Sequence, residues 1–183
     1  MNPLNLAIFC GSGTPNDKEL HHQLDLFLDQ LFKRNEINLV YGGASIGVMA
    51  MAADAAMKYG RTATGIMPKL LVDKEVAHES LTTFEEAEDM HQRKARMYQL
   101  SDAFLILPGG YGTLDELFEI STWAQLGVHS KPIMVLNADG YFDELLKFIQ
   151  SSVDHGFVSK QHQQLIQVAR NLDDVERILT LHQ

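Results

Sequence analysis

Short, almost wholly apolar runs alternate with helical patterns along the chain, and this alternation limits the possible folds more than any other feature. The order is typical of a parallel sheet covered by helices on both faces. We therefore predict an α/β fold with one Rossmann-like, doubly wound and mostly parallel sheet. The runs predict strands at 4–10, 37–41, 62–66, 80–84, 103–107 and 132–136, and near 167–169. The segments between them predict helices at 17–34, 47–60, 85–100, 113–127, 139–154, 160–166 and 172–181.

Length and composition fit one domain over residues 1–183, because this length buries a sizeable core but is short for two domains. No stretch approaches the roughly 18–20 apolar residues that span a bilayer, so we expect no membrane partner. The first residues lack the positive region of a signal peptide. Cys10 is the only cysteine, which excludes an internal disulfide framework and a multi-cysteine zinc site. These features predict a cytoplasmic protein.

The formal net charge of −9 argues against a nucleic acid polymer as the partner, because such partners need an extended basic face. A small anionic ligand needs only a local positive pocket. Arg93, Lys94 and Arg96 form the candidate cluster for that pocket.

Three glycine-bearing turns each follow a predicted strand: CGSG at 10–13, YGGASIG at 41–47 and PGGYGT at 108–113. In a doubly wound sheet such turns lie at the carboxyl ends of the strands, where ligands bind. Glycine lets the backbone approach a phosphate, and the helix that follows offers free N–H groups. The three turns together predict an anion site, with Ser12, Gly42 and Gly43 among its candidates.

The segment PGGYGTLDE at 108–116 is the most specific of these. Gly109, Gly110 and Gly112 form the turn, and Thr113 stands where a helix N-cap belongs. Thr113 and Glu116 have T-x-x-E spacing, so one interpretation is a capping box that satisfies two backbone N–H groups. A carboxylate beside a phosphate is costly, however. Asp115 and Glu116 in this first turn therefore also predict a functional role, such as holding ribose hydroxyls or stabilising a cationic transition state.

The segment MHQRKARM at 90–97 places Met90, Arg93 and Met97 on one helical face. Arg93 either covers a core edge with its aliphatic stem or contacts a partly buried anion or purine. A third segment brings Glu75 and His78 onto one turn, a pattern more typical of a solvated loop face. No third ligand stands at metal-site spacing, so we predict no metal.

Together, PGGYGTLDE and MHQRKARM resemble the LONELY GUY family, the cytokinin riboside 5′-monophosphate phosphoribohydrolases, which are often labelled lysine decarboxylases. The family patterns are P-G-G-x-G-T-x-x-E and M-H-x-R-K-x-x-M, and this chain matches both. The resemblance extends through residues 121–149 and the first strand. The first loop departs from it, because CGSGTPND stands where many relatives have CGSSxG.

The resemblance implies that Arg93 and Glu116 are catalytic. It places the phosphate- and ribose-binding loop on Gly110, Tyr111, Gly112, Thr113, Leu114 and Asp115. It also matches Lys94, Thr122 and Glu75 to further substrate-contacting positions, and it implies a homodimer with sites near the interface. The small, apolar helix at 47–60 likewise indicates an extra covered surface.

The implied reaction is hydrolysis of the N-glycosidic bond of a purine nucleoside 5′-monophosphate, with adenine or an N6-modified adenine as the base and no cofactor. Free base and ribose 5-phosphate are the products. Loss of the base leaves positive charge on ribose C1′. Glu116 is expected to stabilise that charge, bind ribose hydroxyls or orient water. Arg93 is expected to hold the base or balance its negative charge.

Three other functions compete with this one. Glycine loops also bind phosphates in non-catalytic nucleotide or cofactor carriers. A pyridoxal-phosphate decarboxylase needs a Schiff-base lysine, for which Lys94 between two arginines is the candidate, but no second cofactor signature accompanies it. An NAD-dependent oxidoreductase is disfavoured, since the first loop lacks the third glycine of G-x-G-x-x-G.

Overall fold

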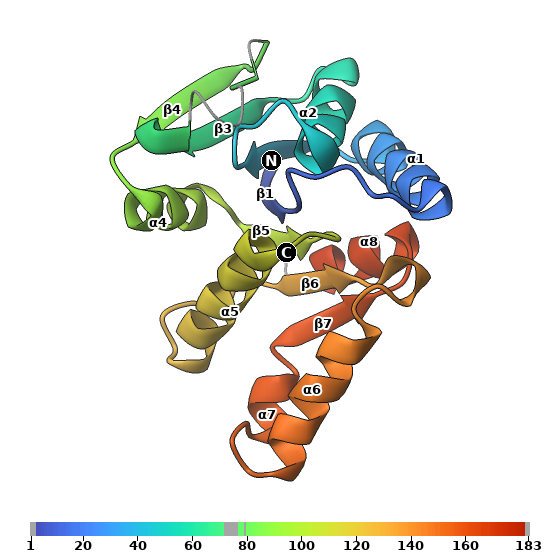
Figure 1. The fold of residues 1–183 in the computed structure, drawn as a ribbon, viewed down its shortest axis with the longest axis vertical. Helices are drawn as coiled ribbons and strands as arrows, with labels where there is room; N and C mark the ends of the chain where they lie inside the picture. The colour runs from blue at the N-terminus through green and yellow to red at the C-terminus, as the bar shows by residue number, and fades with distance from the viewer. Residues whose placement is uncertain (1–2, 72–76, 79, 182–183) are drawn as a thin grey trace.

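The computed structural model describes residues 3–71, 77–78 and 80–181. In this part of the chain seven strands form one sheet in the order β4-β3-β2-β1-β5-β6-β7, and every neighbouring pair is parallel (Figure 1). The predicted α/β class is confirmed. The strands are β1 (Leu4–Phe9), β2 (Ile37–Tyr41), β3 (Ala63–Pro68), β4 (Thr83–Ala87), β5 (Ala103–Ile106), β6 (Ile133–Leu136) and β7 (Ile166–Ala169).

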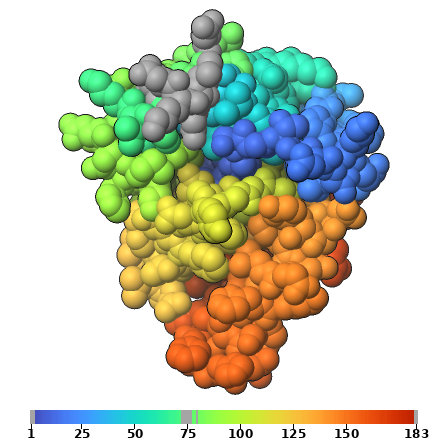
Figure 2. Space-filling view, in the orientation of Figure 1, coloured from blue at the N-terminus to red at the C-terminus, as the bar shows by residue number. Residues whose placement is uncertain are grey.

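Helices cover both faces of this sheet, as Figure 1 shows. One face carries α1 (Lys18–Arg34), α2 (Gly47–Lys58) and α8 (Leu172–Leu181). The other carries α4 (Met90–Leu100), α5 (Tyr111–Gln125) and α6 (Asp143–Asp154). A 3-10 turn, η1 (Ala138–Gly140), and the short α7 (Lys160–Gln163) complete the chain. In the space-filling view the N-terminal half of the chain lies at one end of the molecule, and α6 lies at the other end (Figure 2).

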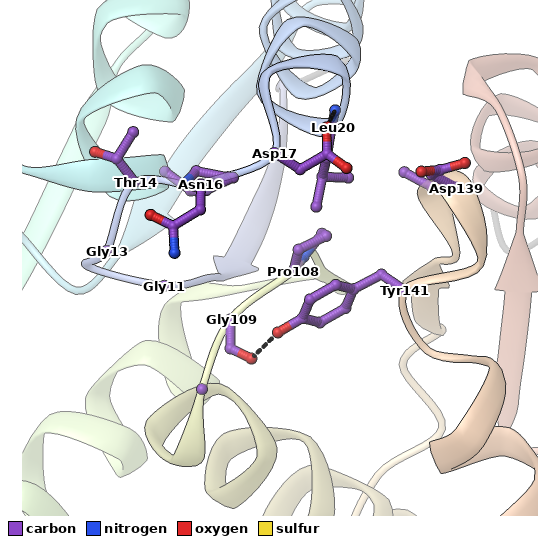
Figure 3. Close-up of a pocket in the computed structure, with 14 residues that line it drawn as sticks. Gly11, Gly13, Thr14, Asn16, Asp17, Leu20, Pro108, Gly109, Asp139 and Tyr141 are labelled. Atoms are coloured by element: carbon purple, nitrogen blue, oxygen red, sulfur yellow. Dashed lines mark hydrogen bonds between the residues drawn. The ribbon is translucent and has the colours of Figure 1, made fainter.

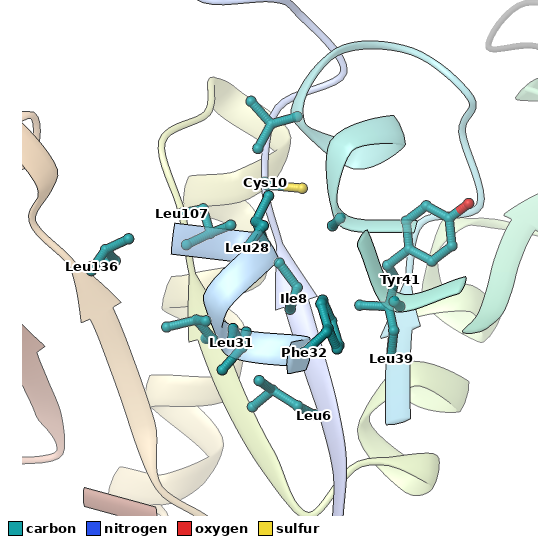
Figure 4. Packing of buried hydrophobic residues seen from close by; sticks show 14 of the residues in the cluster. Leu6, Ile8, Cys10, Leu28, Leu31, Phe32, Leu39, Tyr41, Leu107 and Leu136 are labelled. Atoms are coloured by element: carbon teal, nitrogen blue, oxygen red, sulfur yellow. The ribbon is translucent and has the colours of Figure 1, made fainter. Parts of the chain in front are cut away.

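The two faces of β1 show why the strand is almost wholly apolar. Leu6 and Ile8 enter the core under α1 and α2, whereas Ala7 and Phe9 enter the core under α4 and α5. Alternate residues of a strand point to opposite faces, so a strand covered on both sides must be apolar throughout. Figure 4 shows Leu6 and Ile8 packed beside Leu28, Leu31 and Phe32.

The helices differ in whether a side chain caps their N-terminus. Asp17 caps α1 by accepting hydrogen bonds from the amides of Glu19 and Leu20, and Asp89 caps α4 through the amide of Gln92. The helices that follow glycine turns differ, because α2 and α5 have no side-chain cap. In α2 the Met49 amide of the first turn donates to the Gly11 carbonyl (3.3 Å). The first amide groups of α5 stay available to a ligand.

The predicted bounds of four elements were wrong. The strand expected at 80–84 lies at 83–87, and the following helix starts at Met90 rather than at residue 85, because Asp89 caps it. Helix α7 spans only Lys160–Gln163, not 160–166. Helix α5 starts at Tyr111 with Gly110 as its N-cap, so Thr113 lies inside the helix and the T-x-x-E capping box does not form. The other elements agree with the prediction to within about four residues.

No helix in the described ranges is long and apolar enough to cross a membrane.

Candidate active site

The three glycine turns meet at the carboxyl edge of the sheet, as predicted. The amide of Gly11 donates to the carbonyl of Pro108 (3.2 Å), and the amide of Met49 donates to the carbonyl of Gly11 (3.3 Å). At Gly47, where φ is +60°, a side chain would collide with the backbone carbonyl of Ser12. The turns after β1, β2 and β5 therefore form one continuous surface. It lies at the switch point of the sheet, since β1 is flanked by β2 and β5.

The start of α5 is open on its outer side. A Cβ atom added to Gly110 or Gly112 would meet nothing within 4 Å among the described residues, and neither residue has a positive φ. Contacts with the described residues therefore do not require glycine at these two positions. A ligand that approaches the backbone closely would require it.

Thr113 lies directly behind this opening. Its side chain is buried, and its hydroxyl has no hydrogen-bond partner in the part of the chain that the structure describes. A side chain at Gly109 would collide with this hydroxyl. A buried hydroxyl without a partner is costly, so Thr113 is suited to a ligand that supplies one.

Arg93 and Glu116 come together from α4 and α5, and both are buried. The Arg93 Nη2 atom lies 3.8 Å from Glu116 Oε1, too far for a hydrogen bond. On its other side the Arg93 Nε–H donates to the backbone carbonyl of Ile66 in β3 (3.1 Å), which fixes the guanidinium. Gly42 makes room for it, because a side chain there would collide with Nη2.

The environment of Glu116 shifts its ionisation strongly. Burial raises the pKa of Glu116 to about 7, the positive charge of Arg93 opposes this rise, and the neighbouring Asp115 adds to it. Near neutral pH this carboxyl group can therefore both accept and release a proton. Cys10 lies close by at the end of β1, and burial raises the pKa of its thiol, so it stays uncharged.

The predicted basic cluster does not persist as a positive pocket. Lys94 forms ion pairs with Asp115 (3.0 Å) and Glu119 (3.1 Å), and Arg96 forms two hydrogen bonds with Glu85 (2.6 and 3.0 Å). Successive helical residues point about 100° apart, so each cation meets different neighbours. Only Arg93 of the three faces Glu116.

The remaining predicted residues lie in different surroundings. Tyr111 is almost fully exposed at the start of α5, and Leu114 is half-buried in the next turn. Thr122 is exposed farther along α5, where its hydroxyl donates to the carbonyl of Phe118 (2.7 Å). Gly43 is buried after β2, and its carbonyl accepts the amide of His78. Glu75 lies outside the described residues.

Sequence reasoning missed Tyr141. It lines a cavity of about 510 Å³ beside the glycine turns, together with Asp17, Asp139 and the backbone of Gly109. The Tyr141 hydroxyl donates to the carbonyl of Gly109 (2.8 Å), as Figure 3 shows. The turn signal Asn137–Gly140 was visible in the sequence, but no local pattern connects it to residue 109.

Comparison with known proteins agrees with this site. A family model described as "possible lysine decarboxylase" matches residues 49–179. Cytokinin riboside 5′-monophosphate phosphoribohydrolase LOG2 of Arabidopsis thaliana is 44% identical over 174 residues, which cover 95% of this chain and 81% of that protein. The probable phosphoribohydrolase LOG6 of the same plant is 47% identical over 154 residues, or 84% of this chain and 76% of its own length. This chain belongs to the LONELY GUY family.

The predicted family is thus confirmed, and solved structures confirm the predicted fold of this LONELY GUY protein. A molybdenum cofactor carrier protein from Chlamydomonas reinhardtii superposes with a TM-score of 0.70 at 19% identity, covering 98% of this chain and 97% of that one. A molybdenum cofactor binding protein from Rippkaea orientalis gives a TM-score of 0.69 at 19% identity, with 99% and 98% covered. At this identity the likeness concerns the fold alone.

Proposed function

We propose that this protein hydrolyses the N-glycosidic bond of a purine nucleoside 5′-monophosphate, releasing free base and ribose 5-phosphate. The observation that carries the proposal is the buried Arg93–Glu116 pair beside the uncapped start of α5. An anion-binding backbone next to a carboxyl group of raised pKa suits a substrate with a phosphate at one end and a developing positive charge nearby. Membership of a phosphoribohydrolase family supports the same reaction.

In this proposal the 5′-phosphate binds the first amide groups of α5, those of Tyr111, Gly112 and Thr113. Their N–H groups have no partner within the helix, and the helix dipole adds to their attraction for an anion. The open space over Gly110 and Gly112 admits the phosphate, and the Thr113 hydroxyl, for which the described residues offer no hydrogen-bond partner, donates to it. Gly42, Gly43 and Ser12 shape the adjoining turns, and we retain them as substrate-site candidates.

Glu116 then acts at the ribose. The C1′–N9 bond breaks, its electron pair leaves with the base, and positive charge develops at C1′. The Glu116 carboxylate faces this charge and accepts a proton from the attacking water as the oxygen–C1′ bond forms. The same proton is returned to the departing base, so atoms and charges balance. A pKa of about 7 allows both transfers near neutral pH.

Arg93 serves the base side of the same step. Its guanidinium is held by the Ile66 carbonyl through Nε–H, Nη1 lies 3.8 Å from the Met90 sulfur, and Nη2 lies 3.8 Å from Glu116. A fixed cation there stabilises the negative charge that the purine gains as it leaves. It also keeps part of the Glu116 population ionised, because it lowers the pKa of that residue relative to burial alone.

A Schiff-base role for Lys94 does not fit its surroundings. Burial acts to lower its pKa, but hydrogen bonds to Asp115 and Glu119 outweigh burial and leave the pKa raised. A Schiff-base lysine must instead lose its proton readily. In this proposal Lys94 instead fixes Asp115 near the ribose hydroxyls, which keeps both residues in the substrate site without a pyridoxal cofactor.

The base is proposed to be adenine or an N6-modified adenine, on the strength of the family alone. The test compares kcat/KM for AMP, isopentenyladenosine monophosphate, CMP and adenosine, with free base followed by chromatography. We expect adenosine to react at least 100-fold more slowly than AMP, because each lost hydrogen bond to a charged group is worth about 1.5–3 kcal/mol. Efficient adenosine cleavage would refute the phosphate site, and a preference for CMP would refute the purine assignment.

The same experiment separates an enzyme from a carrier, the role in the name of the Chlamydomonas reinhardtii protein that shares this fold. A carrier binds the nucleotide and returns it intact. Base release that disappears in a Glu116→Gln variant identifies an enzyme. An isopentenyl nucleotide cleaved much faster than AMP would identify a cytokinin-producing one.

We also propose a homodimer formed through the outer face of α5. Phe118 and Leu126 are exposed there at 41% and 70%, with Thr122 between them. Thr122 follows Glu116 by six residues, about 240° around the helix at 100° per residue, so it points away from its own site. In a symmetric dimer it serves the site of the second copy. Light scattering should give twice the 20.5 kDa chain mass, and Leu126→Glu should halve it. A wild-type monomer would refute this interface.

The compartment proposed is the cytoplasm. The only cysteine, Cys10, is a buried free thiol, which suits a reducing environment.

A further inference from the structure

The Gly109–Gly110 peptide has little internal restraint. Neither residue has a Cβ atom, so both accept backbone conformations that other residues avoid, and the peptide between them can rotate at low cost. Rotation would exchange the sides on which the Gly109 carbonyl and the Gly110 N–H lie. A loop that binds an anion through N–H groups must prevent this, because a carbonyl oxygen in their place repels the anion.

One side of this peptide is held by packing. The Gly109 Cα lies between two turns, since an added Cβ would collide with the Thr113 hydroxyl and lie 2.7 Å from the Gly11 amide nitrogen. The Gly11 amide itself donates to the Pro108 carbonyl (3.2 Å). These contacts place the α-carbon of Gly109 but leave the plane of the following peptide to be fixed by another group.

Tyr141 fixes it. Its hydroxyl donates to the Gly109 carbonyl at 2.8 Å, across the cavity shown in Figure 3. In a trans peptide the C=O and N–H point in opposite directions. The bond to Tyr141 therefore turns the Gly110 N–H away from the cavity. A hydrogen bond to the carbonyl also polarises the peptide and strengthens its N–H as a donor.

The loop before α6 is built to present this tyrosine. Asn137 accepts the amide of Phe142 (2.8 Å) and donates to Asp143 (2.8 Å) through its side chain. Asp139 is the only non-glycine residue with positive φ in the described chain, at +50°. The Tyr141 ring stands edge-on against the buried Phe142, with centroids 4.9 Å apart. Two side-chain hydrogen bonds and the contact with Phe142 thus hold the loop around Tyr141, a residue that is itself 47% exposed.

We propose that Tyr141 is a positioning residue for the phosphate: it holds the Gly109–Gly110 peptide in the orientation in which the start of α5 binds the substrate's phosphate. The inference rests on the proposed function, since it assumes a phosphate at that helix start. Tyr141 touches the loop through a backbone carbonyl and takes no part in bond breaking. Its loss therefore affects binding of phosphorylated ligands more than the chemical step.

The test is Tyr141→Phe, which removes the hydroxyl and keeps the ring on Phe142. We expect KM for AMP to rise about tenfold, equivalent to roughly one hydrogen bond, with kcat within about twofold of wild type. The inhibition constant of ribose 5-phosphate should rise by the same factor, whereas slow cleavage of unphosphorylated adenosine should not change. The thermal midpoint should stay within about 2 °C, because Tyr141 is an exposed residue and the change removes one hydrogen bond.

Tyr59→Phe is the matched control. The Tyr59 hydroxyl also makes one hydrogen bond, to Asp29 (2.8 Å), but at the end of α2 opposite the glycine turns. It should leave KM and the ribose 5-phosphate constant unchanged. The proposal is overturned if Tyr141→Phe leaves both constants at wild-type values, or if it slows adenosine and AMP by equal factors.

Failure of the proposed function gives a different result. If wild-type protein releases no base from AMP, calorimetry with ribose 5-phosphate still reports on the loop. Binding that weakens in Tyr141→Phe then supports the positioning role without the hydrolysis. Binding that is absent from the wild type, or equal in both proteins, overturns the positioning role as well.

Discussion

The guanidinium of Arg93 stands 3.8 Å from the carboxyl group of Glu116, with both side chains only 6% exposed. Buried opposite charges ordinarily close to hydrogen-bonding distance, because each lacks water. Here Arg93 is held back by the Ile66 carbonyl, and Gly42 leaves the space into which it extends. Each group therefore keeps hydrogen-bonding capacity for a third partner, and the proposed nucleotide supplies that partner.

The first prediction concerns pH. If the Glu116 carboxylate accepts a proton from water, kcat rises with pH through the pKa that Glu116 has in the substrate complex; in the free protein burial raises this pKa to about 7. The measurement is kcat between pH 5.5 and 9 at saturating substrate, so that ionisation of the free nucleotide does not contribute. A kcat that stays flat over this range, or falls as pH rises through 7, would contradict the role assigned to Glu116.

Removal of Arg93 should move that pH midpoint. Arg93 lowers the pKa of Glu116, so Arg93→Ala should shift the rising limb to higher pH, besides reducing kcat at pH 7 by orders of magnitude. Arg93→Lys keeps a positive charge and serves as the control, with its midpoint closer to wild type. An Arg93→Ala midpoint at or below the wild-type value would disprove the coupling.

Gly42 is predicted to be intolerant of even one methyl group. A Cβ there collides with the Arg93 guanidinium and lies 3.0 Å from the Met49 sulfur, so Gly42→Ala should displace Arg93 from Glu116. We expect kcat/KM to fall at least about tenfold, since small displacements of catalytic groups have large effects. Circular dichroism should show an intact fold. Wild-type activity in a folded Gly42→Ala protein would mean that the position of Arg93 is not critical.

Acid should destabilise the fold partly through His129. Burial lowers its pKa, its Nε2–H donates to the Ile120 carbonyl (2.9 Å), and its Nδ1 accepts the Lys131 amide (3.1 Å). A depressed native pKa means that the unfolded chain binds the proton first. Stability from this group is therefore complete above about pH 6.5 and falls as pH falls through the lower native pKa.

Urea unfolding at pH 7.5 and pH 5 measures this loss. Wild type should lose more unfolding free energy between the two pH values than His129→Gln does. Equal losses in the two proteins would remove His129 as a source of the acid sensitivity.

The sequence predicted those structural features that depend on residues close together in the chain. Strands apolar on both faces predicted the parallel sheet, and the glycine turns predicted its ligand edge, because both signals are local. The Thr113 capping box failed for a local reason too, since the N-cap is Gly110, three residues before Thr113.

Contacts between distant elements could not be predicted in this way. Lys94 and Arg96 looked like a basic cluster, but acidic residues of α5 and β4 neutralise them. Tyr141 donates a hydrogen bond to Gly109, which lies 32 residues earlier in the sequence. Gly42 leaves space for the side chain of Arg93, which lies 51 residues later. Such pairings depend on where the sheet places its loops in space. The sequence of a single segment does not contain that information.

Base release by wild type and Glu116→Gln tests the central claim most directly. Both proteins are incubated with AMP at pH 7.5, and adenine and ribose 5-phosphate are quantified by chromatography after circular dichroism has confirmed folding. The account predicts equal amounts of the two products from wild type and a rate lower by orders of magnitude in Glu116→Gln. Adenine release at the wild-type rate from folded Glu116→Gln, or none from wild type with AMP or isopentenyladenosine monophosphate, would contradict it.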